Sequence, residues 1–161
     1  LVTHWVRQPS QVGTESGLFW YKRTIDQDVS DNKIYFDTLR DGRFHEYKLP
    51  LSEESLKKIR VDPIGSGEKT KEIEISSIVV ADSDGEILAN FTLGEPNWTF
   101  RNFDSIKLVN GNWIGRPESI DPYLVSPEID IEGASEIRIR MRIQGLSYIF
   151  SRWFYYQWLI R

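Results

Sequence analysis

The stretch that decides the fold is Ile137-Arg138-Ile139-Arg140-Met141-Arg142-Ile143. Apolar and basic side chains alternate along its whole length, and successive side chains of a β-strand point to opposite faces of the sheet. The stretch therefore predicts a strand with one buried apolar face and one arginine-bearing face.

A second, nearly alternating run occupies residues 73–80, and the segment Asp82-Ser83-Asp84-Gly85 follows it. Its Asp-Gly step is a turn signal, and the apolar run 87–91 comes next. These residues predict a β-hairpin. Other short runs, rich in aromatic and β-branched residues and bounded by Gly, Asp, Asn or Pro, predict strands at residues 17–23, 33–38, 44–49 and 58–61.

Strand-like runs recur at intervals of about 8–12 residues with no helical pattern between them. This spacing predicts an all-β fold, an antiparallel sandwich or barrel. The one helical signal lies at residues 52–58, where a serine cap and acids in the first turn favour a single helical turn. The polar residues 65–71 predict a mobile loop between strands.

Composition and charge narrow the class of protein. The chain has 161 residues, of which 40% are hydrophobic and 27% charged, and a formal net charge of −4. These values are typical of one globular domain, residues 1–161, that needs no disulfide or metal for stability. The absence of cysteine excludes thiolate metal sites and cysteine nucleophiles. The excess of Asp and Glu, 24 against 20 Lys and Arg, argues against a nucleic-acid partner.

Residues for catalysis are also scarce. The sequence holds only two histidines, His4 and His45, and shows no nucleophile elbow, phosphate loop or carboxylate dyad. We therefore expect no enzyme activity from the chain itself. Asp62 and Asp121 each precede a proline, a pair typical of turns in which the carboxylate accepts backbone N–H groups.

Calcium is an alternative for the aspartates, because it takes several oxygen ligands. Besides the two Asp-Pro residues, weak candidates are Asp26, Asp28 and Asp31. Their spacing lacks the glycine and the distal glutamate of an EF-hand loop. We expect no other cofactor.

Aromatic residues are the unusual part of the composition, since they make up 13% of the chain and include six tryptophans. Such rings serve either as core or as platforms on which sugars stack their C–H faces beside polar side chains. Trp20 is a stacking candidate if it faces outward and a core residue if it faces inward. Trp113, flanked by turn residues, is expected to be exposed, whereas Trp98 and Phe100 alternate as core residues do.

Several motifs occur in a recognisable order. They occupy residues 17–21, 33–36, 41–47, 58–63 and 73–78, and the most specific is Ile59-Arg60-Val61-Asp62-Pro63. In this order they resemble the second part of the carbohydrate-binding-module-like jelly-roll β-sandwiches. Those domains accompany bacterial glycosidases, glycosyltransferases and membrane proteins of envelope polysaccharide synthesis.

The second half of the chain resembles the beginning of the same kind of domain, through residues 97–100, 121–127 and 136–142. The two parts of such a domain therefore occur in this chain in the opposite order. One interpretation is a permuted single sandwich in which residues 148–160 pair beside residues 1–23. The other is a cut through tandem modules, with residues 1–95 ending one module and residues 96–161 beginning the next.

The resemblance implies a non-catalytic module of a larger glycan-handling protein, with polysaccharide or oligosaccharide as its ligand. Candidate stacking residues are then Trp20, Tyr21 and Trp113, and candidate hydrogen-bonding residues are Arg23, Asp26 and Asn112. The alternative is a structural domain that docks a glycosyltransferase domain or a partner subunit.

Residues 148–160 form an apolar, aromatic run that is too short to span a membrane. They predict one or two core strands, with a segment lying on a membrane surface or under a neighbouring domain as the alternative. The chain begins at Leu1 without a signal-peptide pattern, and we interpret it as a fragment or a mature product. The resemblance favours the cell envelope or secretion as its location.

Overall fold

The structure is a computed structural model that describes residues 14–21, 33–64, 70–91, 97–118 and 121–145. Every helix or strand assigned in these ranges is a β-strand, which confirms the predicted all-β class. The strands are β1 (Thr14–Tyr21), β2 (Lys33–Thr38), β3 (Asp41–Leu56), β4 (Lys58–Asp62), β5 (Thr70–Ala81), β6 (Ile87–Phe91), β7 (Thr99–Arg101), β8 (Phe103–Val109), β9 (Asn112–Pro117), β10 (Tyr123–Val125) and β11 (Ile131–Gly145).

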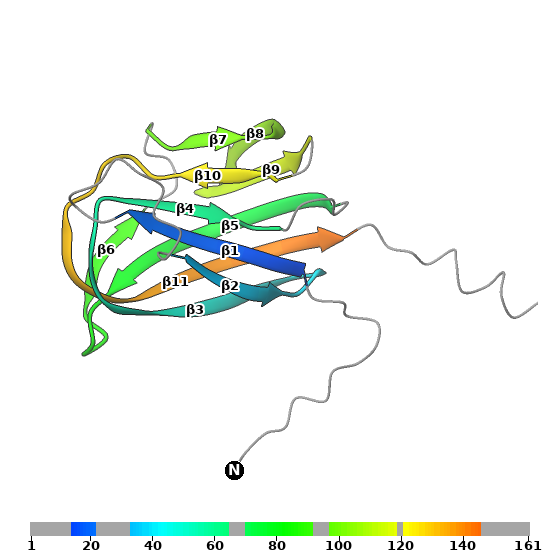
Figure 1. The fold of residues 1–161 in the computed structure, drawn as a ribbon. Coiled ribbons are helices and arrows are strands. Elements are labelled where there is room, and N and C mark those ends of the chain that lie inside the picture. The colour runs from blue at the N-terminus through cyan, green and yellow to red at the C-terminus, as the bar shows by residue number, and fades with distance from the viewer. Residues whose placement is uncertain (1–13, 22–32, 65–69, 92–96, 119–120, 146–161) are drawn as a thin grey trace, which may run out of the picture.

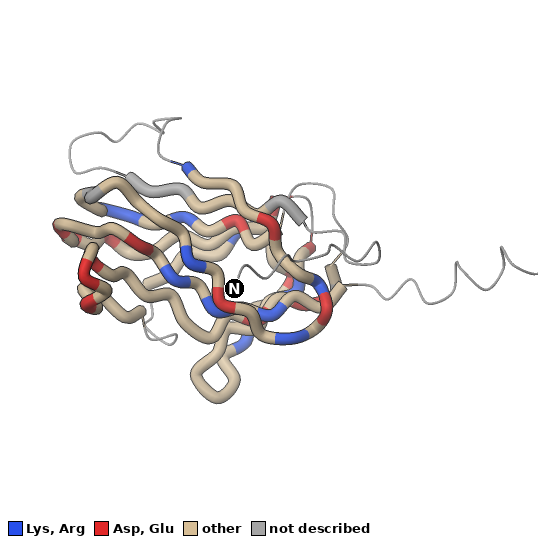
Figure 2. Tube along the Cα trace, turned by 90° about the horizontal axis from the view of Figure 1, so that it is seen from below, with Lys and Arg blue, Asp and Glu red and all other residues tan. Residues whose placement is uncertain are grey.

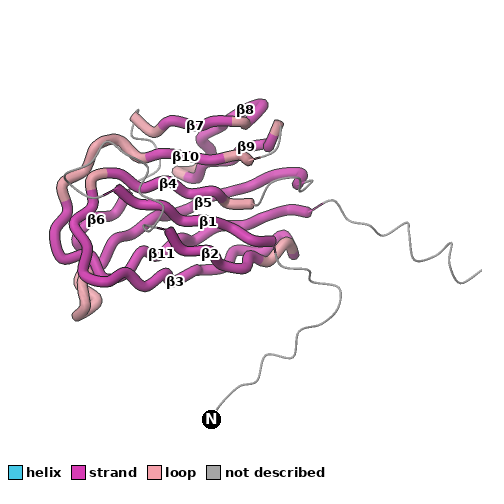
Figure 3. The backbone as a smooth tube through the Cα atoms, viewed as in Figure 1, coloured by secondary structure: helices cyan, strands magenta, loops and turns pink. Residues whose placement is uncertain are grey.

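The strands form two antiparallel sheets that pack face to face, so the predicted sandwich is confirmed (Figure 1). One sheet has the order β2-β1-β4-β10-β7; the other has the order β3-β11-β5-β9-β8, with β6 also paired to β5. Both sheets contain strands from residues 1–95 and from residues 96–161, and in the second sheet β11 lies between β3 and β5 (Figure 3). The described residues therefore share one hydrophobic core.

Strand β11 lies between β3 and β5 and supplies the centre of the core. The apolar residues of its alternating stretch are at most 1% exposed, and the arginines between them are half-buried or exposed, as the pattern predicts. The facing sheet contributes fully buried residues from three strands: Leu18, Ile59, Val61 and Leu124. Alternation along single strands thus places the core between the two sheets.

The predicted hairpin is present as β5 and β6, with Ile78 opposite Phe91. Asp82 organises the turn, because its Oδ1 accepts hydrogen bonds from the backbone N–H groups of Asp84 and Glu86, each at 2.9 Å. Gly85 has a φ of 85°, which a side chain would disfavour.

The helical turn predicted at residues 52–58 is wrong. Strand β3 runs through to Leu56, where Glu54 and Leu56 pair with Ala134 and Ile131 of β11. This pairing satisfies the backbone N–H and C=O groups and buries Leu56. It therefore stabilises the strand more than the local capping signal stabilises a helical turn. Two other predictions concern residues that lie wholly or partly outside the described part, namely 148–160 and residues 65–69 of the predicted loop 65–71. Residues 70 and 71 of that loop belong to strand β5, so the loop prediction is wrong for them.

Gly115 in β9 marks a close approach between strands. A Cβ at this position would lie 2.7 Å from Phe103 Cδ1 and 2.9 Å from Ile106 Cδ1. We expect Gly115→Ala to lower the free energy of unfolding by about 1–3 kcal/mol through overpacking, measured by urea denaturation. In a Phe103→Leu background the same substitution should cost less, because the ring atoms are gone. Equal costs in both backgrounds would contradict the steric explanation.

Candidate functional site

Two predicted stacking residues, Trp20 and Tyr21, end strand β1. Their backbones pair with Ile59 and Lys58 of β4, and their side chains lie outside what the structure describes. The same holds for the whole of four further predicted residues, namely Arg23, Asp26, Asp28 and Asp31. Their stacking, hydrogen-bonding and calcium-binding roles stay predictions.

The prediction that Trp113 is exposed is wrong, because the residue is only 5% exposed. It packs edge-on against two other rings, with centroid distances of 4.9 Å to Trp98 and 5.1 Å to Phe100. A tryptophan held in this way cannot offer its face to a sugar. Trp98 is buried as predicted, and Phe100 is partly buried against the core.

Asn112 precedes this tryptophan on β9, but its amide is already engaged. Its Nδ2 donates to Glu74 Oε1 at 2.6 Å, and the other oxygen of Glu74 accepts from Arg142. The side chain of Glu74 is 8% exposed. Asn112 and Trp113 therefore do not form a common sugar site with the predicted residues of β1.

The outer face of the five-stranded sheet carries the most exposed aromatic residue of the described part. Along β2, Ile34 and Phe36 pack against the core while Lys33, Tyr35 and Asp37 are exposed. Tyr35 is 53% exposed, and Lys33 Nζ lies 5.4 Å from its ring centroid.

A row of backbone partners crosses this sheet from β2 to β4. Tyr35 is opposite Gly17, and Gly17 is opposite Asp62. Since neighbouring strands lie about 4.8 Å apart, the Cα atoms of Tyr35 and Asp62 are about 10 Å apart. Gly17, which has no side chain, lies between them.

A cluster of polar side chains continues the row. Arg60 binds Asp62 in a bidentate manner, with Nε to Oδ1 at 2.7 Å and Nη2 to Oδ2 at 2.8 Å. Its guanidinium lies 3.9 Å from the ring centroid of Tyr123 on β10 and 3.4 Å from Asp121 Oδ2. The two Asp-Pro steps of the sequence thus meet at one arginine. They bind a guanidinium, whereas the sequence predicted backbone N–H groups as partners.

Asn102 holds the Asp121 end of the cluster. Both residues have left-handed backbones, with φ of 61° and 62°, which Asn and Asp tolerate better than most residues. Asn102 Nδ2 donates to the carbonyl oxygen of Asp121 at 2.8 Å, and the Asn102 carbonyl accepts from Glu118 N–H at 3.0 Å. The carboxylate of Asp121 is left 48% exposed beside the guanidinium.

The electrostatics of the cluster keep Arg60 charged. Burial alone would lower the pKa of Arg60, but the hydrogen bonds and negative charge of Asp62, aided by Asp121, raise it above its ordinary value. Across the molecule, Lys and Arg are interspersed with Asp and Glu (Figure 2). Among the described residues, no group of three or more His, Asp or Glu is placed to hold a metal ion. Nor does any helix there have the length and apolar character to cross a membrane.

Sequence reasoning missed Tyr35, Arg60 and Tyr123 as site residues. The alternation of residues 33–37 contains the signal for Tyr35, and the two-residue spacing of Arg60 and Asp62 places both on one face. The contact between β4 and β10 has no local signal.

The chain matches no protein-family model, no curated protein sequence and no solved structure at a significant level.

Proposed function

We propose that this domain binds polysaccharide through the outer face of its five-stranded sheet and catalyses no reaction. The observation that carries the proposal is the exposed ring of Tyr35 on a face whose neighbouring described side chains are charged. A tyrosine ring offers an apolar surface for the C–H face of a sugar, while its hydroxyl stays hydrated.

The Arg60–Asp62 pair supports the same function. The Arg60 guanidinium is fixed by Asp62 and is 21% exposed, so it can donate to a sugar hydroxyl. Asp121 adds an exposed carboxylate at 3.4 Å from the guanidinium. Because Tyr35 on β2 and Arg60 on β4 lie two strands apart, a ligand that touches both crosses the strands and has more than one sugar unit.

We expect Tyr35→Ala to weaken polysaccharide binding about twofold to twelvefold, because one stacking ring contributes about 0.5–1.5 kcal/mol. The measurement is native affinity electrophoresis in gels that contain soluble β-glucan, xylan or galactomannan. Calorimetry with oligosaccharides of the retarding polymer then gives the dissociation constants. Trp20→Ala in the same assay tests the stacking role predicted from the sequence.

The matched control is Leu108→Ala, because Leu108 is exposed to the same degree, 54%, but lies on β8 of the other sheet. It should bind like the wild type. Migration unaffected by all three polymers would overturn the proposal. So would equal binding by the Tyr35 and Leu108 variants, since the site would then lie elsewhere.

A second candidate function, a docking domain for a partner protein, is favoured by a different observation. Five of the six exposed large apolar side chains in the described residues lie on β6 and β8, and all five are aliphatic: Ile87, Leu88, Ile106, Leu108 and Val109. Aliphatic side chains suit protein contact better than sugar stacking.

A further inference from the structure

The start of strand β6 forms an apolar surface with an open edge. Ile87 and Leu88 are 58% and 41% exposed. β6 pairs with β5 along one side, and no strand within the described ranges pairs along its other side. Charged residues usually protect such edges, yet β6 contains none. Exposed aliphatic residues on an unprotected edge are typical of protein contact surfaces.

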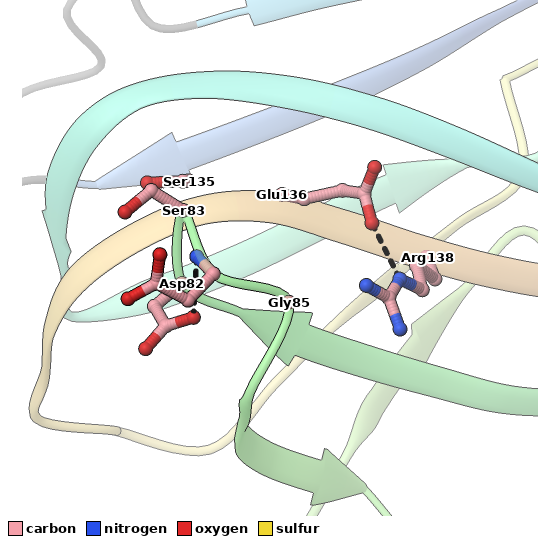
Figure 4. A pocket seen from close by; sticks show the side chains of 7 residues that line it. Asp82, Ser83, Gly85, Ser135, Glu136 and Arg138 are labelled. Carbon is pink, nitrogen blue, oxygen red and sulfur yellow. Dashed lines mark hydrogen bonds and ion pairs between the residues drawn. The ribbon is translucent and has the colours of Figure 1, made fainter.

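A polar pocket of about 300 Å³ lies beside this surface (Figure 4). Its walls are the β5–β6 turn, residues 82–85, and three residues near the start of β11, Ser135, Glu136 and Arg138. Gly85 lines the pocket, and Ile87 follows two residues later, so their Cα atoms are at most about 7 Å apart. A single short segment of a partner can therefore contact both the pocket and the aliphatic residues.

The pocket carries an excess of negative charge. Its lining includes three carboxylates, those of Asp82, Asp84 and Glu136, and one guanidinium, that of Arg138. Asp82 Oδ1 binds backbone N–H groups of the turn, and Glu136 is paired with Arg138. The Asp84 carboxylate makes no hydrogen bond or ion pair with any other described side chain. The complementary group is a cation.

We propose that this surface, Ile87 and Leu88 with the adjoining acidic pocket, docks a segment of another protein. The segment carries a Lys or Arg side chain flanked by aliphatic residues. The cation enters the pocket beside Asp84, and the aliphatic side chains cover Ile87 and Leu88. This interaction is additional to polysaccharide binding, which uses the other sheet.

Other occupants fit less well. A sugar gains little from the aliphatic flank, because stacking requires an aromatic ring. A second copy of this chain in a dimer whose two-fold axis passes through this surface would place one acidic pocket against another, and like charges oppose such a contact. Nucleic acid is repelled by the same carboxylates.

The probe is a blocked heptapeptide, Ser-Gly-Leu-Lys-Val-Gly-Ser, compared with versions that have Glu or Gln in place of Lys. Binding to the full chain is followed through amide chemical shifts in heteronuclear NMR, which detects weak complexes. We expect the Lys peptide to shift amides of residues 82–88 and 135–138. Its affinity should exceed that of the Glu peptide by at least about tenfold.

Two variants separate the charge from the apolar contact. Asp84→Asn should weaken the Lys peptide by roughly tenfold and leave the Gln peptide unchanged, because only the charge is removed. Ile87→Ser should weaken both peptides. The matched control on β8, Asp104→Asn, removes the charge of a carboxylate that is also exposed and should bind like the wild type.

Several outcomes would overturn the proposal. They are equal affinity for the Lys and Glu peptides, shifts on β8 in place of the β5–β6 turn, and no shifts at the solubility limit. Self-association in sedimentation velocity that Ile87→Ser abolishes would identify a second copy as the occupant. None of these results bears on the Tyr35 assay, so the two proposals fail independently.

Discussion

Replacing Trp113 by alanine is expected to lower the free energy of unfolding by about 3–5 kcal/mol. The indole is 5% exposed and meets the rings of Trp98 and Phe100 at 4.9 and 5.1 Å. Trp98 in turn packs edge-on against Phe91 at 5.6 Å. Truncation removes the buried indole surface and leaves a cavity between rigid rings, which close over it only in part.

The measurement is guanidinium denaturation followed by far-UV circular dichroism, because the substitution itself alters tryptophan fluorescence. Trp113→Phe keeps one ring in the cluster and should lose markedly less stability. If the alanine variant does not fold, the phenylalanine variant still reports the contribution of the indole. Tyr35→Ala, at an exposed position, should change stability by no more than about 0.5 kcal/mol.

An alanine variant as stable as the wild type would show that the indole lies outside the core and would restore Trp113 as a stacking candidate. The expected destabilisation has a bearing on binding studies. Loss of polysaccharide binding in a Trp113 variant would report a damaged fold, so it would not identify a sugar contact. Tyr35 is the informative position, because its truncation leaves the core intact.

The strands with strong local patterns could be predicted from the sequence. Residues 137–143 alternate strictly, and the predicted burial of their apolar face is what the structure shows. The β5–β6 hairpin follows from its Asp-Gly turn, and β2 has the predicted bounds of residues 33–38. In each case the signal lies within the strand or the turn itself, where side-chain alternation and φ preferences operate.

Other features depend on contacts between segments that are distant in the sequence. For these features the local sequence pattern gave the wrong prediction. The serine and acids at residues 52–58 resemble a helix start, but strand β11 supplies hydrogen-bond partners for β3 through Leu56. Trp113 stands next to the Asn110-Gly111 turn, which suggests exposure. Its strand nevertheless pairs with β5, where Trp113 lies opposite the buried Ile75. Proximity to a turn says nothing about which face a side chain takes.

The same distinction applies to the candidate site, of which only some features could be predicted from the sequence. The outward position of Tyr35 and the shared face of Arg60 and Asp62 follow from two-residue periodicity. The contact of Asp121 with Arg60 joins residues 61 positions apart and depends on the pairing of β4 with β10. No periodicity within either segment predicts that these two residues meet. The resemblance to jelly-roll modules rests on the two segments separately, so it does not predict the contact either.

Asp62→Ala is expected to lower the free energy of unfolding by about 3 kcal/mol. The side chains of Asp62 and Arg60 are only 9% and 21% exposed, and they form two parallel hydrogen bonds. Without Asp62, the Arg60 guanidinium still contacts the ring of Tyr123 and the Asp121 oxygen that lies 3.4 Å away. A partly buried cation then lacks its main partner, and the penalty for burying it is no longer offset.

The matched control is Glu128→Ala, which breaks the exposed Lys58–Glu128 pair, with side chains 39% and 80% exposed. It should cost no more than about 1 kcal/mol, since solvent screens exposed pairs. Combining Asp62→Ala with Arg60→Leu should recover part of the stability lost, because the partly buried cation is then removed together with its carboxylate. If instead Asp62→Ala costs no more than Glu128→Ala, the pair contributes little to the fold.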